Sequence, residues 1–179
     1  MSASWIPAAR NFITNQEGLR LISYQDVCGV WTIGAGLTRL DGIPVQPGMC
    51  ITRAQADAGL DYEMQRTALL LDNIVKVPLS DAQYVALADF AYNLGGAALA
   101  GSTLLRLLNS GDLDGAAQQF LAWDKGRIHG RLVEIDGLRK RRVAEQVMFL
   151  SGISVAPAPT ELTADQLMQQ ELQQLGDAQ

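Results

Sequence analysis

A change in sequence period, from helical spacing to short apolar runs and back, most limits how this chain can fold. Over residues 4–17 apolar side chains recur every three or four positions, which predicts a helix that Gly18 ends. Over residues 21–45 short apolar runs alternate with glycines, which predicts short antiparallel strands joined by glycine turns. A helical pattern returns at residue 52, so a small sheet is expected between helices.

The segment after the sheet is predicted to be almost entirely helical. Thr52-x-x-Gln55 and Ser80-x-x-Gln83 have the capping-box pattern that opens a helix. The expected elements are helices over residues 52–71, 80–93, 102–108 and 112–123, a glycine-punctuated loop over 126–137, and a helix over 138–150. A long helix that connects the sheet to the helical part would leave a cleft between them, where ligand sites are favoured.

These patterns place the chain in the α+β class. We expect one domain over residues 1–150, made of a sheet lobe at about 18–51 and a helical lobe at about 72–150 that also includes helix 4–17. A chain of 179 residues can form such a domain without a metal or disulfide to stabilise it. Residues 151–179 begin with a proline-containing linker and continue as an acidic tail with the pattern of a short helix.

The scarcity of histidine and cysteine excludes several classes of site. With His129 as the single histidine and Cys28 and Cys50 as the two thiols, a zinc site built from several such ligands is excluded. No GxxxxGK[ST] loop is present for phosphate binding. Carboxylate chemistry remains, with no metal or cofactor expected. Two cysteines are too few for a disulfide scaffold, so free thiols are expected, and a later Cys28–Cys50 bridge stays an open alternative.

Glu17 and Asp26 are the carboxylates whose expected environments differ most. The negative end of the helix dipole and apolar neighbours tend to raise the pKa of Glu17, as a general acid needs near neutral pH. Asp26 falls in a polar turn with exposed backbone amides and should stay ionised. Two carboxylates whose environments separate their pKa values are typical of glycoside hydrolysis. The alternative is a solvent-exposed helix end at Glu17 and a turn former at Asp26.

Residues 17–36 resemble the catalytic segment of the phage-type lysozymes, glycoside hydrolase family 24. The family pattern is Glu, eight residues, Asp, five residues, Thr and a Gly-x-Gly turn, and Glu17, Asp26, Thr32 and the two glycines match every position. Three later segments also fit, in the expected order: Phe90-Ala-Tyr-Asn-Leu-Gly95, Ser102-Thr-Leu-Leu, and Gly137-Leu-x-x-Arg141-Arg142-x-x-Glu145 preceded by Trp123. The resemblance covers about residues 4–150 and does not extend to the tail.

The resemblance implies a lysozyme-like fold, with the active-site cleft between a small β-hairpin lobe and a larger helical lobe. It implies Glu17 as general acid, with Asp26 activating a water molecule that Thr32 orients. The substrate would be the β-1,4 bond between N-acetylmuramic acid and N-acetylglucosamine in peptidoglycan. Family members are generally inverting, so the two carboxyl groups should stand about 6.5–9.5 Å apart. Tyr92 and Asn93 would line the cleft and hold acetamido groups.

In the family an arginine of the late basic helix approaches the catalytic Glu. Arg141 and Arg142 both match that helix, and we include Arg141 among the substrate-binding residues although the register stays open. A cation there would lower the pKa of Glu17, or it would only connect the lobes. The sequence departs from the family at Leu37, where many members carry a histidine that pairs with an acidic residue. We expect a repacked contact or lower stability there, with catalysis retained.

The resemblance implies the function of an endolysin, a metal-independent muramidase that lyses the host cell. The N-terminus has no positive segment followed by an apolar one, and no apolar run is long enough to span a bilayer. We therefore expect a monomer without signal peptide or signal anchor that folds in the host cytoplasm and reaches the periplasm through a holin. Two alternatives remain: a lytic transglycosylase acting on the same bond, and a catalytically silent peptidoglycan-binding module.

The charges are distributed unevenly between body and tail. The net charge is −5, but the tail carries four acidic residues and no basic one, so the first 150 residues are close to neutral. Seven of the 14 basic residues fall between Lys125 and Arg142. Because this cluster lacks interleaved aromatic residues, we expect a solvated face or attraction to the anionic cell wall, and no binding of nucleic acid.

Overall fold

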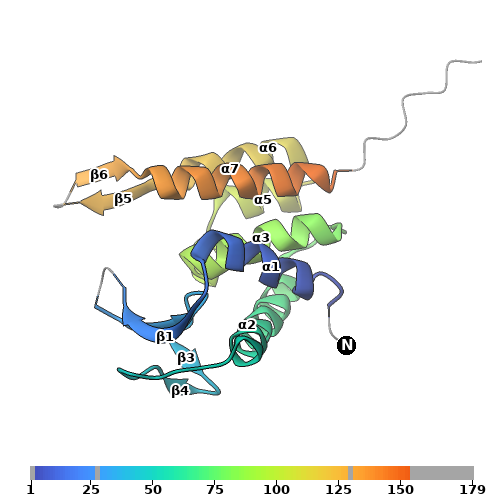
Figure 1. Cartoon of the computed structure of the whole chain (residues 1–179). Helices are drawn as coiled ribbons and strands as arrows, with labels where there is room; N and C mark the ends of the chain where they lie inside the picture. Colours follow the sequence, from blue (N-terminus) through green and yellow to red (C-terminus); the bar gives the residue numbers. More distant parts are fainter. Residues whose placement is uncertain (1–2, 27–28, 129–130, 154–179) are drawn as a thin grey trace, which may run out of the picture.

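The computed structural model describes residues 3–26, 29–128 and 131–153, which form a helix-rich chain with small antiparallel strand pairs (Figure 1). The expectations for His129, for a Cys28–Cys50 bridge and for a helix in the tail lie outside the described residues. The elements in chain order are α1 (Ile6–Glu17), β1 (Arg20–Gln25), β2 (Trp31–Gly34), β3 (Arg39–Leu40), β4 (Ile43–Pro44), α2 (Arg53–Ile74), α3 (Asp81–Leu94), α4 (Gly96–Ala100), α5 (Thr103–Asn109), α6 (Leu113–Gln119), the 3₁₀ helix η1 (Phe120–Trp123), β5 (Lys125–Ile128), β6 (Arg131–Glu134) and α7 (Asp136–Ser151). The α+β class predicted from the sequence is confirmed.

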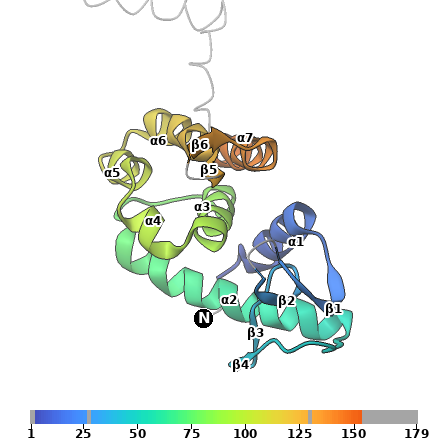
Figure 2. The same ribbon diagram turned by 90° about the vertical axis from the view of Figure 1, so that its left-hand side faces the viewer.

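Two apolar clusters form the interior, and α2 contributes to both. The large cluster packs α1, α3 and the later helices around fully buried side chains such as Phe90 and Phe120. The small cluster lies in the sheet region and consists of Ile33, Leu37, Val45, Ile51 and Ala56. Ala56 is near the start of α2, whereas Leu60 and Met64 further along the helix belong to the large cluster. Figure 2 shows α2 running from the strands to the other helices.

The turn after β2 is one of the parts of the sheet region that reach the cleft. β1 and β2 pair antiparallel, and beyond β2 the backbones of Ile33 and Leu37 exchange two hydrogen bonds of 2.8 and 2.9 Å. The tight turn that these bonds close needs positive φ at Gly34 (66°) and Gly36 (94°). Glycine reaches these angles without steric cost, which explains the Gly-x-Gly pattern.

The long helices begin where the capping boxes predict them. The Thr52 hydroxyl accepts the backbone N–H of Gln55 at 3.2 Å, while the Gln55 side chain accepts the Thr52 N–H at 2.8 Å. Ser80 opens α3 in the same way. α2 continues to Ile74, three residues past the predicted end, because Ile74 still packs against the large cluster. No helix in the described part of the chain is long and apolar enough to cross a membrane.

The predicted loop over residues 126–137 is wrong. Lys125–Ile128 and Arg131–Glu134 pair as the antiparallel hairpin β5–β6, in which Gly126 lies opposite Val133. A Cβ at position 126 would lie 2.5 Å from Ile135 Cδ1. Gly126 therefore marks a close approach of side chain to backbone within a strand, and not a loop.

The short helix α4 was also not predicted. Gly95 ends α3 with a φ of 92°, and the same residue stands directly before α4. The second glycine, Gly96, packs against α2, where a Cβ would lie 2.4 Å from Leu70 Cδ2. The glycine pair thus ends one helix and starts another close to α2.

Candidate active site

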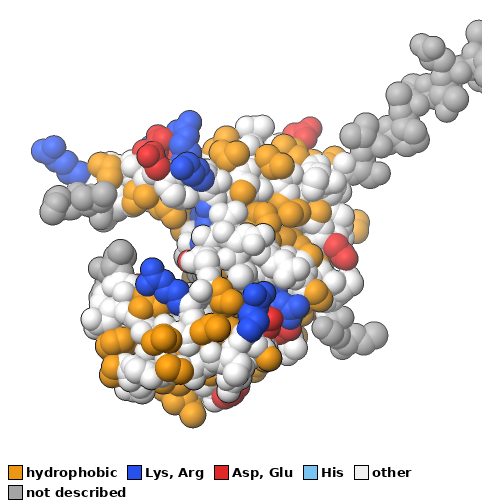
Figure 3. Space-filling view, viewed as in Figure 1, with side chains coloured by type: hydrophobic (Ala, Val, Ile, Leu, Met, Phe, Trp, Pro, Cys, Tyr) orange, Lys and Arg blue, Asp and Glu red, His pale blue; other side chains and the backbone are white. Residues whose placement is uncertain are grey.

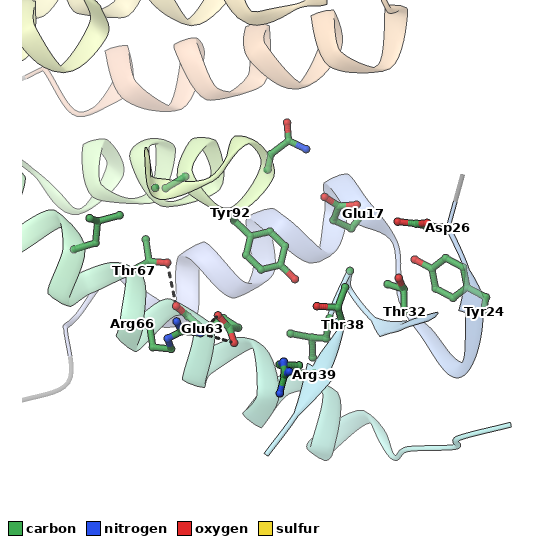
Figure 4. Close-up of a pocket in the computed structure, with 16 residues that line it drawn as sticks. Glu17, Tyr24, Asp26, Thr32, Thr38, Arg39, Glu63, Arg66, Thr67 and Tyr92 are labelled. Atoms are coloured by element: carbon green, nitrogen blue, oxygen red, sulfur yellow. Dashed lines mark hydrogen bonds and ion pairs between the residues drawn. The ribbon is translucent and has the colours of Figure 1, made fainter. Parts of the chain in front are cut away.

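A cleft of about 660 Å³ opens between the sheet region and helices α2 and α3 (Figure 4). Its wall on α2 carries Glu63 and Arg66, which pair at 3.3 Å. Arg141 does not line the cleft and lies behind it, in contact with the end of α1. The cleft brings together the other predicted site residues, which are Glu17, Asp26, Thr32, Tyr92 and Asn93.

Glu17 is the last residue of α1, and its side chain enters the cleft. The helix ends there because Gly18 adopts a φ of 75° while its N–H still bonds to Thr14 O at 2.9 Å. Ile13, one turn earlier, is fully buried and anchors α1 in the large cluster. The Glu17 side chain is 28% exposed, and its Oε1 accepts a hydrogen bond from Nη1 of Arg141. The carboxyl group therefore faces open space on one side and a cation on the other.

Arg141 is held by a buried carboxylate of α3. Its Nε and Nη2 donate to Asp89 Oδ2 and Oδ1 at 2.9 and 2.6 Å, and Asp89 has no exposed surface. Burial alone would lower the pKa of Arg141, but the hydrogen bonds to Asp89 and Glu17 outweigh burial and raise that pKa. The guanidinium therefore stays charged, with two of its nitrogens bound to Asp89 and the third at Glu17.

Arg142 does not approach Glu17. It is fully buried, donates to Glu145, and lies 5.1 Å from the centroid of the Phe90 ring. Burial lowers the pKa of Arg142. Burial and a hydrogen bond with Asp89 raise the pKa of Glu145. Of the two arginines that the sequence left open, Arg141 is the one that contacts Glu17.

Asp26 lies directly after β1, in the turn between β1 and β2. The backbone N–H of Val30 donates to Asp26 Oδ1 at 2.8 Å, and the backbones of the same two residues bond at 3.0 Å. These bonds orient the carboxylate from the main chain of the turn. Figure 4 shows Asp26 and Glu17 at the same end of the cleft, far from Arg66.

Thr32 belongs to β2 and is 4% exposed, and in the view of Figure 4 it lies beneath Asp26. Its hydroxyl donates to the carbonyl oxygen of Val30 at 3.1 Å. Since that hydrogen bond uses the hydroxyl proton, the oxygen of Thr32 can only accept further hydrogen bonds. Asp26 and Thr32 therefore present two acceptors to the cleft.

Tyr92 connects α3 to the turn after β2. Its hydroxyl donates to the carbonyl oxygen of Ala35 at 2.9 Å. Burial, followed by the nearby charge of Glu17, raises the pKa of Tyr92, so the phenol stays neutral. A Cβ on Gly36 would lie 3.3 Å from the Tyr92 hydroxyl and 3.7 Å from Glu17 Cδ. The glycine thus allows the turn to approach both side chains.

Asn93 follows Tyr92 at the end of α3 and lines the same cleft. Its Oδ1 atom is buried and accepts no hydrogen bond from the described residues. A buried amide oxygen without a donor is costly, and a bound N–H group would satisfy it. Asn93 is thus a polar residue of the cleft wall whose amide oxygen has no donor among the described residues.

Leu37, where the family often has histidine, belongs to the small cluster and is 3% exposed. Its Cδ1 atom faces α2 at Gly59, where a Cβ would lie only 2.8 Å away. A side chain at position 59 would collide with Leu37. The leucine is therefore accommodated by a glycine on the facing helix.

The basic cluster between residues 125 and 142 is not one solvated face. Arg141 and Arg142 are buried, so that expectation is wrong for these two residues. Arg139 pairs with Glu134 on β6 and lies 3.8 Å from Asp124. Figure 3 shows the basic side chains of this view in separate groups, with other surface between them.

Sequence reasoning missed Asp89, and it named Glu145 only as a position in the pattern of the late basic helix. Asp89 interrupts the apolar run of residues 85–91 within α3, and all seven of these residues are buried. A charged residue in such a run is rarely buried unless it is paired, which was the available signal. The described residues contain no group of three or more His, Cys, Asp or Glu side chains that could hold a metal ion.

Comparison with known proteins finds relatives in one family, by sequence and by structure. The family model for phage lysozyme matches residues 14–145. An endolysin of Acyrthosiphon pisum secondary endosymbiont phage 1 is 41% identical over 139 residues, covering 78% of this chain and 92% of that protein. An endolysin of Salmonella phage P22 is 39% identical over 140 residues, with the same coverage. The solved endolysin from Escherichia coli O157:H7 phage FAHEc1 has a TM-score of 0.78 at 32% identity, covering 86% of this chain and 95% of that one.

Proposed function

This chain belongs to the phage lysozyme family, and on that premise we propose that Glu17, Asp26 and Thr32 hydrolyse the β-1,4 bond between N-acetylmuramic acid and N-acetylglucosamine. Family membership makes the chain a lysozyme, a glycoside hydrolase that lyses peptidoglycan. One observation carries the finer proposal: the three side chains line one cleft, and two of them are carboxyl groups at the same end of it.

Glu17 acts as the general acid. Its proton passes to the glycosidic oxygen as the bond to the sugar C1 breaks, which converts the leaving group into a neutral alcohol. The side chain suits this task because it enters the cleft from the end of a helix that is anchored in the large cluster. Arg141 contacts the carboxyl group from behind and leaves its cleft side open to the sugar.

Asp26 and Thr32 activate the attacking water. A water molecule that donates one hydrogen to each of these acceptors has a lone pair left to attack C1. Asp26 takes up a proton as the water oxygen bonds to C1. Attack from the face opposite the leaving group inverts the configuration at C1. Thr32 suits this role because its own proton is already bound to the Val30 carbonyl.

Asn93 and Tyr92 bind the sugars from the α3 side. The Oδ1 of Asn93, which has no donor among the described residues, accepts the N–H of an acetamido group. The hydroxyl of Tyr92 is bonded to Ala35, so Tyr92 contributes chiefly its ring surface and the position of the turn. Acetamido groups occur on both sugars of peptidoglycan, which fits an amide acceptor in the cleft.

The Glu17→Gln variant tests the assignment of the acid. Glutamine keeps the size of the side chain but has no proton to donate, so release of reducing ends from purified sacculi should fall by about 10³-fold or more. The control is Asp57→Asn, which removes a carboxylate that pairs with Arg53 on the exposed side of α2, outside the cleft. Retained activity in Glu17→Gln would refute the assignment. Wild-type binding to sacculi without release of reducing ends would favour the silent binding module.

The route to peptidoglycan is a separate part of the proposal. The relatives at 39–41% identity are named endolysins, which supports lysis of a host cell from within. We propose that this chain depends on a holin to pass the inner membrane. Bacteria that express the chain alone should keep growing, whereas co-expression with a holin should cause lysis. Prompt lysis without the holin would contradict this dependence.

A further inference from the structure

The hydrogen bonds of Arg141 point to a role for Asp89 that the proposed reaction does not yet include. We infer that Asp89 is a positioning residue: it fixes the Arg141 guanidinium so that a single N–H reaches Glu17, while most of the cationic charge is balanced by a carboxylate outside the cleft. This inference rests on the proposed role of Glu17 as the acid. Asp89 itself does not line the cleft, so it acts through Arg141.

The geometry supports this role directly. Asp89 takes both Nε and Nη2 of Arg141, at 2.9 and 2.6 Å, in the fork arrangement that guanidinium and carboxylate prefer. The hydrogen bond to Glu17 comes from the remaining nitrogen, Nη1. Both Arg141 and Asp89 are buried, at 6% and 0% exposure, so water offers little screening of the pair.

Loss of this fork would change how the cation acts on the acid. Without a carboxylate at position 89, the charge of Arg141 would have Glu17 as its nearest counterion. The guanidinium could then turn and form two parallel hydrogen bonds with Glu17. Both changes stabilise ionised Glu17, which has no proton to donate. Loss of Asp89 should therefore favour the ionised form of the acid.

Other charged or titratable groups surround Glu17, and none has the same connection to Arg141. From α3, the Tyr92 phenol is neutral and bonded to Ala35. From the turn after β1, Asp26 faces the same end of the cleft. From α7, Arg142 is paired with Glu145, whose nearest approach to Arg141 is 3.9 Å. The groups on α2 are Glu63 and Arg66, which pair with each other.

The pH dependence of sacculus hydrolysis tests the inference. In Asp89→Asn, the alkaline limb of the pH–rate profile should move to lower pH by about one unit, because an uncompensated cation beside a carboxyl group favours its ionised form. The rate should therefore fall about tenfold on the alkaline side and much less on the acidic side. A residue that only supported the fold would lower the rate evenly at all pH values.

Glu145→Gln is the matched control. It also alters a buried carboxyl group, but that group is bonded to Arg142 and approaches Arg141 only to 3.9 Å, so the substitution leaves the fork between Asp89 and Arg141 in place. Its alkaline limb should coincide with that of the wild type. An equal shift in Glu145→Gln, or an unshifted limb in folded Asp89→Asn, would overturn the inference.

A double variant tests whether Asp89 acts through Arg141. In an Arg141→Met background the guanidinium is gone, so adding Asp89→Asn should move the limb far less than it does in the wild type. A shift of the same size in both backgrounds would contradict action through Arg141.

If circular dichroism shows that the Asp89→Asn variant is unfolded, the Asp89→Glu variant tests the positioning role instead. It keeps the charge and displaces the fork, so the limb should stay while the optimum rate falls about tenfold, and an unchanged rate would refute positioning.

These outcomes are separable from the proposed function. An inactive Glu17→Gln variant together with an unshifted Asp89→Asn limb would leave the acid assignment standing and remove only the positioning role. An active Glu17→Gln variant would remove both.

Discussion

The two carboxyl groups of the cleft are held in different ways. Glu17 is contacted by Arg141, which is bound to Asp89, so side chains from two helices control the acid. Asp26 is oriented within one turn by the Val30 N–H, which donates to its carboxylate, and by its own N–H, which donates to the Val30 carbonyl oxygen. The orientation of the proposed acid therefore depends on buried charges behind the cleft, whereas the orientation of the proposed base depends on the path of the main chain in its turn.

The apolar packing near Glu17 also differs from the apolar packing near Asp26. The large cluster on the Glu17 side contains fully buried aromatic rings, with Phe90 stacked edge-on against Phe120 at 5.6 Å. The small cluster on the Asp26 side has five buried members, and the strands of this region also carry exposed apolar residues such as Ile22 and Ile43. Substitutions on the helical side should therefore reduce stability first, and those in the Asp26 turn should reduce activity first.

The largest effect should come from the Asp26 turn. Asp26→Asn removes the proposed proton acceptor while keeping an oxygen for the Val30 N–H, so activity on sacculi should fall by about 10³-fold. The melting temperature should stay close to that of the wild type, since the side chain is only half-buried. Turbidity loss and a thermal melt measure the two quantities. A variant with a lowered melting temperature and unchanged activity would contradict this expectation.

The second largest effect should come from the buried charges. Arg142→Met leaves Glu145 without its guanidinium partner in a site with no exposed surface. Breaking a buried pair from one side costs about 3–5 kcal/mol, so the free energy of unfolding in urea should fall by that amount. Activity at low temperature should be close to normal, because Arg142 makes no contact with Glu17. An inactive but fully stable variant would contradict this separation of roles.

A smaller effect is expected where α2 faces the small cluster. Gly59→Ala places a Cβ 2.8 Å from Leu37 and 2.9 Å from Leu40, and overpacking of this kind costs about 1–3 kcal/mol. The matched control is Gly137→Ala in the first turn of α7, where no atom lies within 4 Å and alanine should stabilise the helix by less than about 1 kcal/mol. Urea unfolding of both variants measures the difference. Equal stabilities would show that Leu37 does not require the glycine.

The smallest effect is expected at the connection between α3 and the turn. Tyr92→Phe removes the hydrogen bond to Ala35 and keeps the ring, which should cost about 1 kcal/mol in the free energy of unfolding. Activity should fall only slightly, because the hydroxyl is not available to the substrate. A large loss of activity would instead assign the hydroxyl a direct role in binding.

Local signals in the sequence were sufficient to predict most helices and several residues that line the cleft. The capping boxes at Thr52 and Ser80 and the glycine after Glu17 are short-range features, and the structure contains all three. The predicted residues Glu17, Asp26 and Thr32 line one cleft, because the helix end and the β1–β2 turn are close in the chain. Their chemical roles stay proposals.

The features that were not predicted depend on contacts between distant segments. Gly126 suggested a loop, but it accommodates Ile135 within the hairpin β5–β6. The choice between Arg141 and Arg142 depends on how α7 rotates against α3, which no local pattern sets. Asp89 lies 52 positions before Arg141, so their pairing could only be seen in the folded chain.

Digestion of purified sacculi in ¹⁸O-labelled water tests the central claim most directly. If Glu17 protonates the bridge and Asp26 activates water, mass spectrometry will show reducing N-acetylmuramic acid ends that carry one ¹⁸O atom. The Asp26→Asn variant will release almost none of them. Unlabelled 1,6-anhydro ends from the wild-type protein would contradict the account, because they form without attack by water.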